Sequence, residues 1–351
     1  MKIAQIAPLY ESIPPKMYGG TERIVYYLTE ELIKQGHHVT LFASGDSRTN
    51  AELVSICDNS LRLNQQCVDP FAHHIVQLQL VQNRISEFDI VHYHTDYFHF
   101  PSSSLNKEVN HVTTVHGRLD IIDLQNVYTV FNGIPLISIS NNQRIPIPYA
   151  NWVGTVYHGL PFNLYKFYPS QGKYLAFLGR ISPEKGVERA IEIAKRSGIK
   201  LIIAAKISNV DEIYFQTTIK PLLNNELIEF IGEIGEKEKG DFLGNAIALL
   251  FPIDWPEPFG IVMIESLACG TPVIGFNKGS VPEILTEGEN GFIIDSIEAG
   301  VKAITNINSV DRAKCRAIFE EKFSAERMTN DYLKIYEQIL KKKVFSNTVN
   351  Y

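Results

Sequence analysis

The sequence predicts an α/β protein made of two Rossmann-like domains, each a doubly wound parallel sheet covered by helices. Strand and helix patterns alternate along the first half of the chain and again along the second half, which is typical of parallel sheets with helical crossovers. A chain of 351 residues is also long enough for two complete cores. The segment between the two cycles, PFNLYKFYPSQG, lies within residues 160–172 and indicates a linker.

We therefore predict a first domain over residues 1–163, a second domain over residues 164–323, and a C-terminal helix over residues 324–351. That helix follows the second domain and is a candidate to pack back on the first. Open parallel sheets bind ligands at the carboxyl ends of their strands. The main site is accordingly expected in a cleft between two facing domains.

The elements of the first domain follow from apolar periodicity. Its helix over residues 21–35 carries Ile24, Val25, Leu28 and Leu32 on one face and ends at Gly36. A second helix is predicted over residues 71–88. The strands are predicted over residues 2–8, 38–43, 89–94, 111–116 and 135–140.

The second domain repeats the pattern. Its strands are predicted over residues 173–178, 200–205, 228–231, 246–251, 272–276 and 291–294. Helices are predicted over residues 183–196, 211–223, 237–243 and 260–269. The last helix, over residues 324–343, carries Met328, Tyr332, Ile335, Tyr336 and Ile339 on one stripe.

Composition excludes several classes of protein. The formal net charge of -6 argues against a nucleic-acid binder. The four cysteines have no CxxC spacing, so we interpret them as reduced thiols. The N-terminal apolar run is a first strand and not a signal peptide. No apolar stretch approaches the roughly 20 residues of a membrane span. We predict a soluble, cytoplasmic protein.

The stretch FPIDWPEPFGIVMIESLACGTPVIG, residues 251–275, places two glutamates near one buried helix. Glu257 lies in a Pro-rich loop, and Glu265 lies in a helix with no polar stripe, where an unpaired carboxylate is rarely tolerated. Glu265 could form an internal salt bridge or cap. Alternatively, both carboxylates hold a polyhydroxylated ligand. Phe259, Gly260 and Ile261 would then offer backbone N–H groups at the helix N-terminus.

The segment GRISPEKG, residues 179–186, follows the first strand of the second domain and opens a helix. Arg180 can grip a phosphate bidentately, and Lys185 adds a point charge near the helix dipole. The alternative is a surface ion pair with Glu184 or Glu188. Position in the fold favours diphosphate binding.

Glycines and histidines supply weaker signals. Gly19 and Gly20 precede the first helix and let backbone N–H groups approach a ligand, although such a pair is often only a loop. His92 and His94 suggest a metal site, but no HExxH, CxxC or Asp-x-Asp accompanies them. His116 ends a strand and could touch a reacting group, bind a sugar hydroxyl, or satisfy a core carbonyl.

Taken in order, GRISPEKG, EPFGIVMIE, ACGTPVIGF and GSVPEIL resemble the retaining glycosyltransferases of family 4. In the first half, YGGTERIVYYLTEELIKQGHHVTLFASGDS resembles the glycine loop, first helix and second strand of the same family. The resemblance covers nearly the whole chain. It implies the GT-B fold and an active site between the domains.

The resemblance also implies roles for individual residues. Arg180 and Lys185 would bind the donor diphosphate, Glu265 the ribose, and Glu257 the transferred sugar. His116 would contact that sugar near its anomeric carbon. Other donor contacts would come from Gly20, Phe259, Gly260, Ile261 and, near a base pocket at residues 232–234, Ile234. As catalytic residues we predict His116, Glu257, Arg180 and Lys185.

Family members retain the anomeric configuration without metal, by same-face attack within a short-lived ion pair. The absence of Asp-x-Asp agrees, so cationic side chains and helix N-termini would stabilise the leaving charge. No metal or cofactor is therefore predicted, and the co-substrate would be a nucleotide-diphospho-sugar, with UDP favoured over GDP or ADP. Alternative functions are a GT-B phosphorylase, a nucleotide-sugar epimerase and a catalytically silent nucleotide-sugar-binding scaffold.

The acceptor is predicted to be a saccharide, natural product or other small molecule. Residues 1–160 contain 10 Lys+Arg and 14 Asp+Glu, an acidic balance that argues against docking on anionic lipid. No nucleic acid is expected as a partner. Candidate acceptor-binding residues in the first-domain loops are Tyr18, Asp96, Tyr97 and Arg118.

Overall fold

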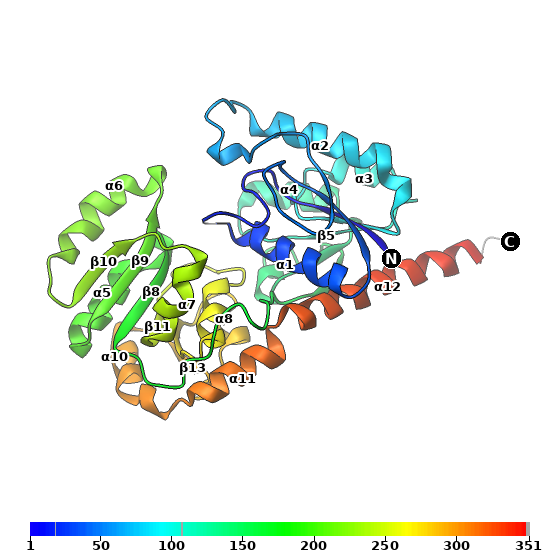
Figure 1. Cartoon of the computed structure of the whole chain (residues 1–351). Helices are drawn as coiled ribbons and strands as arrows, with labels where there is room; N and C mark the ends of the chain where they lie inside the picture. The colour runs from blue at the N-terminus through cyan, green and yellow to red at the C-terminus, as the bar shows by residue number, and fades with distance from the viewer. Residues whose placement is uncertain (18, 107, 349–351) are drawn as a thin grey trace. The chain divides into compact units, whose positions relative to one another are not determined.

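A computed structural model describes residues 1–17, 19–106 and 108–348 of the chain, and the side chains of Leu63 and residues 342–348 lie outside this description. The chain forms two compact units (Figure 1). Unit 1 comprises Met1–Gly159 together with Ala325–Tyr351, and unit 2 comprises Leu160–Ser324. The division therefore falls at Gly159, ahead of the predicted boundary at residue 163.

Unit 1 is built on a parallel sheet of seven strands in the order β3-β2-β1-β4-β5-β6-β7. The strands are β1 (Lys2–Ile6), β2 (His38–Phe42), β3 (Glu52–Val54), β4 (Ile90–Tyr93), β5 (His111–Thr114), β6 (Leu136–Ser138) and β7 (Trp152–Thr155). The order reverses direction between β1 and β4, which lie next to each other in register. Ligands of open α/β sheets bind beside such a reversal, at the carboxyl ends of the strands.

Helices cover both faces of this sheet. They are α1 (Gly20–Lys34), α2 (Pro70–Arg84), α3 (Phe100–Leu105), α4 (Ile122–Val130) and α12 (Ala325–Thr348). Short 3₁₀ turns occur at Leu61–Leu63, Ile85–Glu87 and Asn142–Arg144. Asp69 caps α2 by accepting hydrogen bonds from the N–H groups of Phe71 and Ala72, beside Pro70 at the first helical position.

The last helix belongs to unit 1. In Figure 1 α12, in red, runs from the end of unit 2 beside α1, which it contacts. Met328, Tyr332 and Tyr336 are completely buried. Each buried ring of this kind removes a large apolar area from water and stabilises the unit by about 2 kcal/mol. The stripe on residues 324–343 thus serves the first core, although the helix follows the second in sequence.

Unit 2 is built on a parallel sheet of six strands in the order β10-β9-β8-β11-β12-β13. The strands are β8 (Tyr174–Ile181), β9 (Leu201–Ile207), β10 (Ile228–Gly232), β11 (Ala246–Phe251), β12 (Val273–Phe276) and β13 (Gly291–Ile294). Here the order reverses between β8 and β11. The core beneath α5 and α10 is mainly aliphatic, as expected for strands covered on both faces.

The helices of unit 2 are α5 (Val187–Ser197), α6 (Glu212–Tyr214), α7 (Glu236–Gly244), α8 (Ile261–Ala268), α9 (Val281–Ile284), α10 (Ile297–Asn306) and α11 (Arg312–Lys322). Shorter helical turns occur at Pro183–Lys185, Asn209–Asp211, Phe215–Ile219, Lys220–Leu223 and Ile307–Ser309. These are the segments drawn from green to orange in Figure 1.

Two predicted helices of unit 2 were wrong in detail. The helix predicted over residues 183–196 begins only at Val187, because Gly186 has φ +66° and separates it from the turn at Pro183–Lys185. The helix predicted over residues 211–223 is a chain of short turns that includes a π turn. Pro221 lacks an N–H group and restricts the residue before it, so a regular α-helix cannot run through this segment.

Several elements lie outside the predicted ones: the strands β3 and β7 and the helices α3, α4, α10 and α11. Two of these helices carry signals that could have revealed them. Ser296 caps α10 by accepting from the N–H of Ala299, and Asp311 caps α11 by accepting from the N–H of Ala313. The strands β3 and β7 are short and lie at the two edges of the sheet, where the apolar pattern of a strand is weakest.

Candidate active site

The carboxyl end of β8 in unit 2 carries Arg180. The sequence analysis placed this residue in a turn, but β8 continues to Ile181, so Arg180 lies in the strand and pairs with Lys206 of β9. Its guanidinium forms an ion pair with Glu184, and its Nε lies 3.4 Å from Oδ2 of Asp211. This is one of the ion pairs that the sequence left as an alternative to phosphate binding. About a third of the Arg180 side chain is exposed, so it remains accessible to a ligand.

Lys185 and Glu257 meet at the reversal of the unit 2 sheet. Lys185 comes from the turn after β8 and Glu257 from the loop after β11, and their side chains form an ion pair and hydrogen bond. Trp255 donates from Nε1 to Oε2 of Glu257 at 3.0 Å, and the Lys185 Nζ lies 5.0 Å from the centre of the Trp255 ring. The two charges are 18% and 12% exposed and hence only partly hydrated. A cation held by a carboxylate and an aromatic ring is thus placed at the ligand-binding edge of the sheet.

The loop that carries Glu257 is fixed by its neighbours. Ser280 donates from its backbone N–H to the carbonyl of Glu257 and from its hydroxyl to the carbonyl of Phe259. Gly279 has φ +56°, and a Cβ there would lie 2.3 Å from the Glu257 nitrogen. The segment GSVPEIL therefore packs against the Glu257 loop so closely that a side chain at residue 279 has no room.

The start of α8 is close to the predicted arrangement. The helix begins at Ile261 after Gly260, which has φ +77°, and Pro258 lies in the loop before it. In the part of the chain that the structure describes, the N–H groups of Gly260 and Ile261 donate no hydrogen bond. Phe259 is buried, with its ring 6.3 Å from that of Phe323. Gly260 and Ile261 therefore have N–H groups to offer a ligand.

Glu265 is buried in α8 and lies in a separate cluster. Its Oε1 accepts a hydrogen bond from Nζ of Lys239 at 2.8 Å and from the hydroxyl of Tyr165 at 3.2 Å. Glu236 contacts both partners. The internal salt bridge considered from the sequence is therefore present, and both bonds go to Oε1. Ile234 is half-buried and lies in the segment between β10 and α7. It follows Gly232, which has φ +78°, by two residues.

Unit 1 contains a pocket of about 300 Å³ at the reversal of its sheet. Residues from the ends of β1, β4 and β5 and from the start of α1 line it: Pro8, Tyr10, Gly19, Gly20, Thr21, Glu22, Arg62, His74, His94, Thr95, Asp96, Phe98, His116 and Gly117. Three of the predicted site residues, Gly20, Asp96 and His116, thus come together. The volume suits a ligand about the size of a sugar ring.

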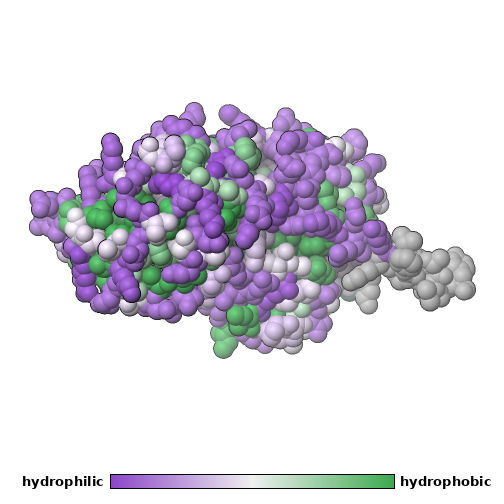
Figure 2. Space-filling view, turned by 90° about the horizontal axis from the view of Figure 1, so that it is seen from below, coloured by the Kyte–Doolittle hydropathy of each residue, from purple (hydrophilic) through white to green (hydrophobic). Residues whose placement is uncertain are grey.

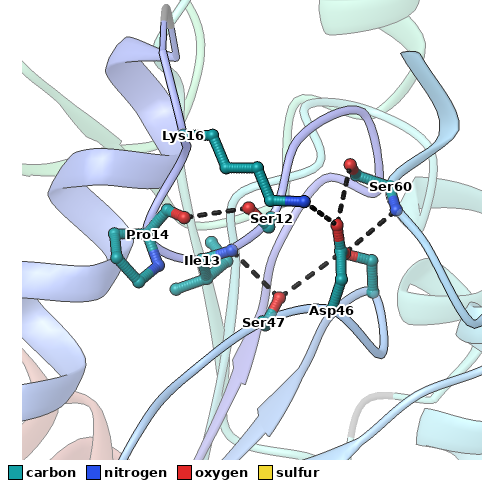
Figure 3. A network of polar contacts seen from close by, with 8 residues as sticks. Ser12, Ile13, Pro14, Lys16, Asp46, Ser47 and Ser60 are labelled. Carbon is teal, nitrogen blue, oxygen red and sulfur yellow. Dashed lines mark hydrogen bonds and ion pairs between the residues drawn. The ribbon is translucent and has the colours of Figure 1, made fainter. Parts of the chain in front are cut away.

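The loop that leads to Gly19 and Gly20 is braced by polar contacts (Figure 3). Ser47 accepts from the N–H of Ile13 at 2.9 Å, and Asp46 accepts from the N–H of Ser60 at 3.0 Å and from Nζ of Lys16 at 3.4 Å. Gly19 then passes Pro15 so closely that an added Cβ would lie 2.7 Å from its ring. These contacts fix the glycines at the mouth of the pocket before any ligand binds.

Two carboxyl groups of the pocket are held in an environment that disfavours their charge. Burial raises the pKa of Asp96 to about 6 and that of Glu22 to about 7. Asp96 also has φ +49°, a left-handed conformation that is uncommon outside glycine and typical of functional sites. Both groups can exchange between hydrogen-bond donor and acceptor near neutral pH.

The histidines of this unit form hydrogen bonds with protein groups. Nδ1 of His94 lies 2.8 Å from Nε2 of His116, and Nδ1 of His92 lies 2.6 Å from the hydroxyl of Tyr336. Burial lowers the pKa of His116 to about 3 and those of His92 and His94 well below their usual value. Among the described residues, no group of His, Cys, Asp and Glu has an arrangement that could hold a metal ion.

Two further acceptor candidates, Tyr97 and Arg118, are not among the described residues that line the pocket. Tyr97 is exposed, with its ring 5.6 Å from Phe98, and Arg118 forms hydrogen bonds to Asp120. Tyr18 lies outside the described residues. Conversely, the sequence analysis missed Trp255, Lys239, Tyr165, Gln5 and His74. Trp255 lies two residues from Glu257, and that proximity could have marked it; the others are set only by tertiary contacts.

Two family models match the chain. The model for glycosyl transferases group 1 matches residues 166–321, in unit 2, and the model for glycosyltransferase family 4 matches residues 18–153, in unit 1. The chain belongs to the group 1 glycosyltransferases of family 4. The predicted family is thereby confirmed, and this glycosyltransferase carries the Lys185–Glu257 pair and most of the lining of the unit 1 pocket in the two matched regions.

Relatives and solved structures agree with this assignment. The glycosyltransferase is 22% identical to the N-acetyl-alpha-D-glucosaminyl L-malate synthase of Bacillus anthracis, over 92% of this chain and 95% of the relative. Its fold is similar to sucrose-phosphate synthase from Thermosynechococcus elongatus, with a TM-score of 0.77, 18% identity and coverage of 97% and 99% of the two chains. It is also similar to Anabaena HepE in complex with UDP and glucose, with a TM-score of 0.73, 18% identity and coverage of 95% and 98%. The predicted GT-B fold is confirmed.

Over the described residues, none of the helices combines the length and apolar character that crossing a bilayer requires. On the face shown in Figure 2, hydrophobic residues form small patches separated by hydrophilic ones.

Proposed function

We propose that the protein transfers a sugar from a nucleoside-diphospho-sugar to a hydroxyl of a small acceptor, without metal and with retention of anomeric configuration. The observation that carries the proposal is the Lys185–Glu257 pair at the reversal of the unit 2 sheet. A partly buried cation at this position suits a diphosphate, and the carboxylate beside it suits sugar hydroxyls. The similar HepE structures hold UDP, UDP with glucose, and UDP-glucose, which supports UDP as the nucleotide.

Binding of the nucleotide-sugar would replace the ion pair between Lys185 and Glu257 with contacts from each residue to the nucleotide-sugar. Glu257 neutralises Lys185, so a phosphate must compete for the Nζ group. Glu257 would then be released to accept hydrogen bonds from the sugar, while Trp255 keeps its Nε1 donor within reach. Arg180 would similarly exchange Glu184 for phosphate. The ion pairs thus hold the charges in place for the donor.

Cations and N–H groups would stabilise the leaving group. The bond between the anomeric carbon and the diphosphate oxygen breaks, and its electron pair passes to the nucleoside diphosphate near Lys185 and Arg180. The acceptor hydroxyl attacks the same face of the sugar and gives its proton to the departing phosphate oxygen. Gly260 and Ile261 would offer N–H groups at the start of α8. Glu265 would reach the ribose through the oxygen that Lys239 and Tyr165 leave open.

The unit 1 pocket would take the acceptor. Asp96 and Glu22 can accept or donate hydrogen bonds to hydroxyls, and the pocket volume matches a monosaccharide unit. An apolar rim adjoins it, because the exposed Phe71 packs edge-on against Phe98 at 5.2 Å. Such a rim favours an acceptor with a ring or short apolar group beside the hydroxyls.

The acidic balance of residues 1–160 argues less against a lipid-linked acceptor than the sequence suggested. Unit 1 also contains α12, and residues 325–351 carry five Lys+Arg against three Asp+Glu. We retain a small acceptor because the pocket with its carboxyl groups favours a hydroxylated molecule. Transfer to free sugars and to lipid-linked sugars should be compared directly.

The first test is binding of UDP, GDP and ADP by titration calorimetry in the presence of EDTA. At least one nucleotide should bind, and replacement of Lys185 by alanine should weaken it. A screen of nucleotide-sugars for slow hydrolysis, followed by nuclear magnetic resonance, would then identify the sugar and the anomer released first. Binding that requires a divalent cation, or release of the inverted anomer, would contradict the proposal.

A further inference from the structure

A buried chain of hydrogen bonds connects the pocket of unit 1 with its C-terminal helix. Gln5 of β1 is completely buried, and its amide contacts two groups: Oε1 lies 2.7 Å from Nε2 of His94, and Nε2 lies 3.3 Å from the hydroxyl of Tyr336. His94 continues to His116, which lines the pocket. Tyr336 continues to His92. Gln5 is the centre of the chain.

The amide group of Gln5 determines which atoms donate and which accept along this chain of hydrogen bonds. A carbonyl oxygen only accepts, so Oε1 of Gln5 requires a proton on Nε2 of His94. Neutral His94 then has a bare Nδ1, which accepts from Nε2–H of His116 at 2.8 Å. A neutral His116 with its proton on Nε2 has a bare Nδ1. That Nδ1 is buried and has no hydrogen-bond partner among the described residues.

On the other side of Gln5, the hydrogen bonds have the same donor-to-acceptor direction. Its amide N–H donates to Tyr336, whose O–H donates to Nδ1 of His92 at 2.6 Å, and Nε2–H of His92 donates to Thr114 at 2.8 Å. The short contact at Tyr336 suits a hydroxyl donor, and the longer one at Gln5 suits an amide donor. If the amide were reversed, the short contact to His94 would have to be an amide N–H donating to nitrogen. The distances favour the first arrangement.

We propose that Gln5, oriented by Tyr336 of α12 and acting through His94, holds His116 as the Nε2–H tautomer, so that the ring of this pocket-lining residue keeps an acceptor on Nδ1 for sugar transfer. The functional part of this inference rests on the proposed transferase activity; the tautomer does not. Gln5, His94 and Tyr336 are positioning residues. The low pKa of His116 agrees, because a neutral ring at physiological pH is needed for Nδ1 to accept.

The test is the tautomer of His116 in the full chain labelled with ¹⁵N-histidine, read from two-bond ¹H–¹⁵N correlations at pH 7.5 and assigned with His116→Gln. The wild type should show the Nε2–H form. Gln5→Met removes both contacts and should give a mixture of tautomers, and Tyr336→Phe should shift the population in the same direction. Gln5→Glu keeps an acceptor for His94 and should restore the Nε2–H form.

Matched controls separate positioning from general damage. Gln77 is another completely buried glutamine of unit 1, whose Nε2 donates to the carbonyls of Ala7 and Phe42, and Tyr128 is a buried tyrosine outside the chain of hydrogen bonds. Gln77→Met and Tyr128→Phe should leave the His116 tautomer unchanged. An Nδ1–H form in the wild type, or an unchanged tautomer in both Gln5→Met and Tyr336→Phe, would overturn the inference.

Activity adds a separate readout. Gln5→Met should lower kcat for sugar transfer about tenfold while changing the Kd of the nucleotide less than twofold, because misplacing one group at the reacting centre affects the transition state more than donor binding. If no transfer activity exists, the proposed function fails while the tautomer result stands. If transfer persists with a normal kcat although the tautomer is lost, the inference fails alone.

Discussion

The two units share one architecture but place different chemistry at the reversal of the sheet. In unit 2, the groups there are charges held in pairs, Lys185 with Glu257 and Arg180 with Glu184, and Lys239 with Glu265 forms a third pair in a separate cluster of the same unit. In unit 1, the groups are neutral histidines joined by hydrogen bonds, beside carboxyl groups whose pKa values are raised by burial. One parallel sheet therefore supports either a charged site for an anion or a neutral site for hydroxyls.

The difference lies in what surrounds each reversal. Unit 2 supplies a partner of opposite charge for each of these ions, and a buried ion pair is stable only while both partners remain. Unit 1 supplies the completely buried Tyr332 and Tyr336 of α12, which cover His92. Burial without a counter-charge drives the imidazoles to the neutral form. The predictions below test this contrast, in order of expected effect.

The largest effect should come from Lys239→Met. It leaves Glu265, with only 3% of its side chain exposed, without its cation, so unit 2 should lose about 3 kcal/mol of unfolding free energy. Urea unfolding followed by amide hydrogen exchange in α8 measures this loss. Lys237→Met, at an exposed position of α7, is the control and should change stability by less than about 0.5 kcal/mol. Equal effects of the two variants would show that the Glu265 pair adds nothing to stability.

Lys185→Ala should act on binding. Loss of a charge-assisted hydrogen bond to phosphate should weaken nucleotide binding by about 1.5–3 kcal/mol, measured by calorimetry. Lys278 provides the control, since it lies 3.7 Å from Asp254 and half of its side chain is exposed. Lys278→Ala should bind almost as the wild type does. An unchanged affinity in Lys185→Ala would show that the diphosphate does not bind at Lys185.

Glu22→Gln should reveal the opposite electrostatics of unit 1. The ordinary pKa of this carboxyl is 4.5, and in the folded chain burial raises it to about 7. The folded state therefore keeps a proton that the unfolded chain releases, so stability is highest below pH 4.5 and is lost as the pH rises through 7. The variant should match the wild type at pH 4 and exceed its stability at pH 8 by at most about 3 kcal/mol. Hydrogen exchange in α1 at the two pH values measures this; equal stability at pH 8 would argue that Glu22 is not neutral when folded.

The smallest effect should come from metal removal. If Lys185 and Arg180 neutralise the leaving group, EDTA should change the transfer rate by less than twofold. Initial rates with the active nucleotide-sugar, with EDTA and with added Mg²⁺ or Mn²⁺, measure this. A large loss in EDTA that either metal restores would reassign the charge stabilisation to a cation.

The sequence predicted most of the secondary structure that surrounds the site. Long apolar runs gave the central strands, and regular periodicity gave α1, α2 and α12. It missed elements whose apolar pattern is too short to recognise or whose structure depends on tertiary contacts. Examples are β7 at the sheet edge and the turns around Pro221. Gly186 was visible as a residue, but its left-handed φ, which separates a helical turn from α5, was not, and neither was the close approach of the Pro252 carbonyl that leaves no room for a Cβ there.

The candidate site divides in the same way. The motifs around Lys185 and Glu257 lie 72 residues apart, yet each is local in sequence and could be recognised alone. Their ion pair, and the contacts of Glu265 with Lys239 and Tyr165, arise only when the strands align. Gln5 gave no signal, because a polar residue in a buried strand has meaning only once its two partners are known.

The sequence by itself determined the fold class, the family and the identity of the charged motifs, because periodicity and turn chemistry are written in neighbouring residues. Tertiary structure decided which charges are paired, which histidines are neutral and which unit receives the last helix. These depend on burial and on contacts between segments up to 331 residues apart, such as Gln5 with Tyr336. Protonation follows from desolvation, and desolvation is a property of the packed chain.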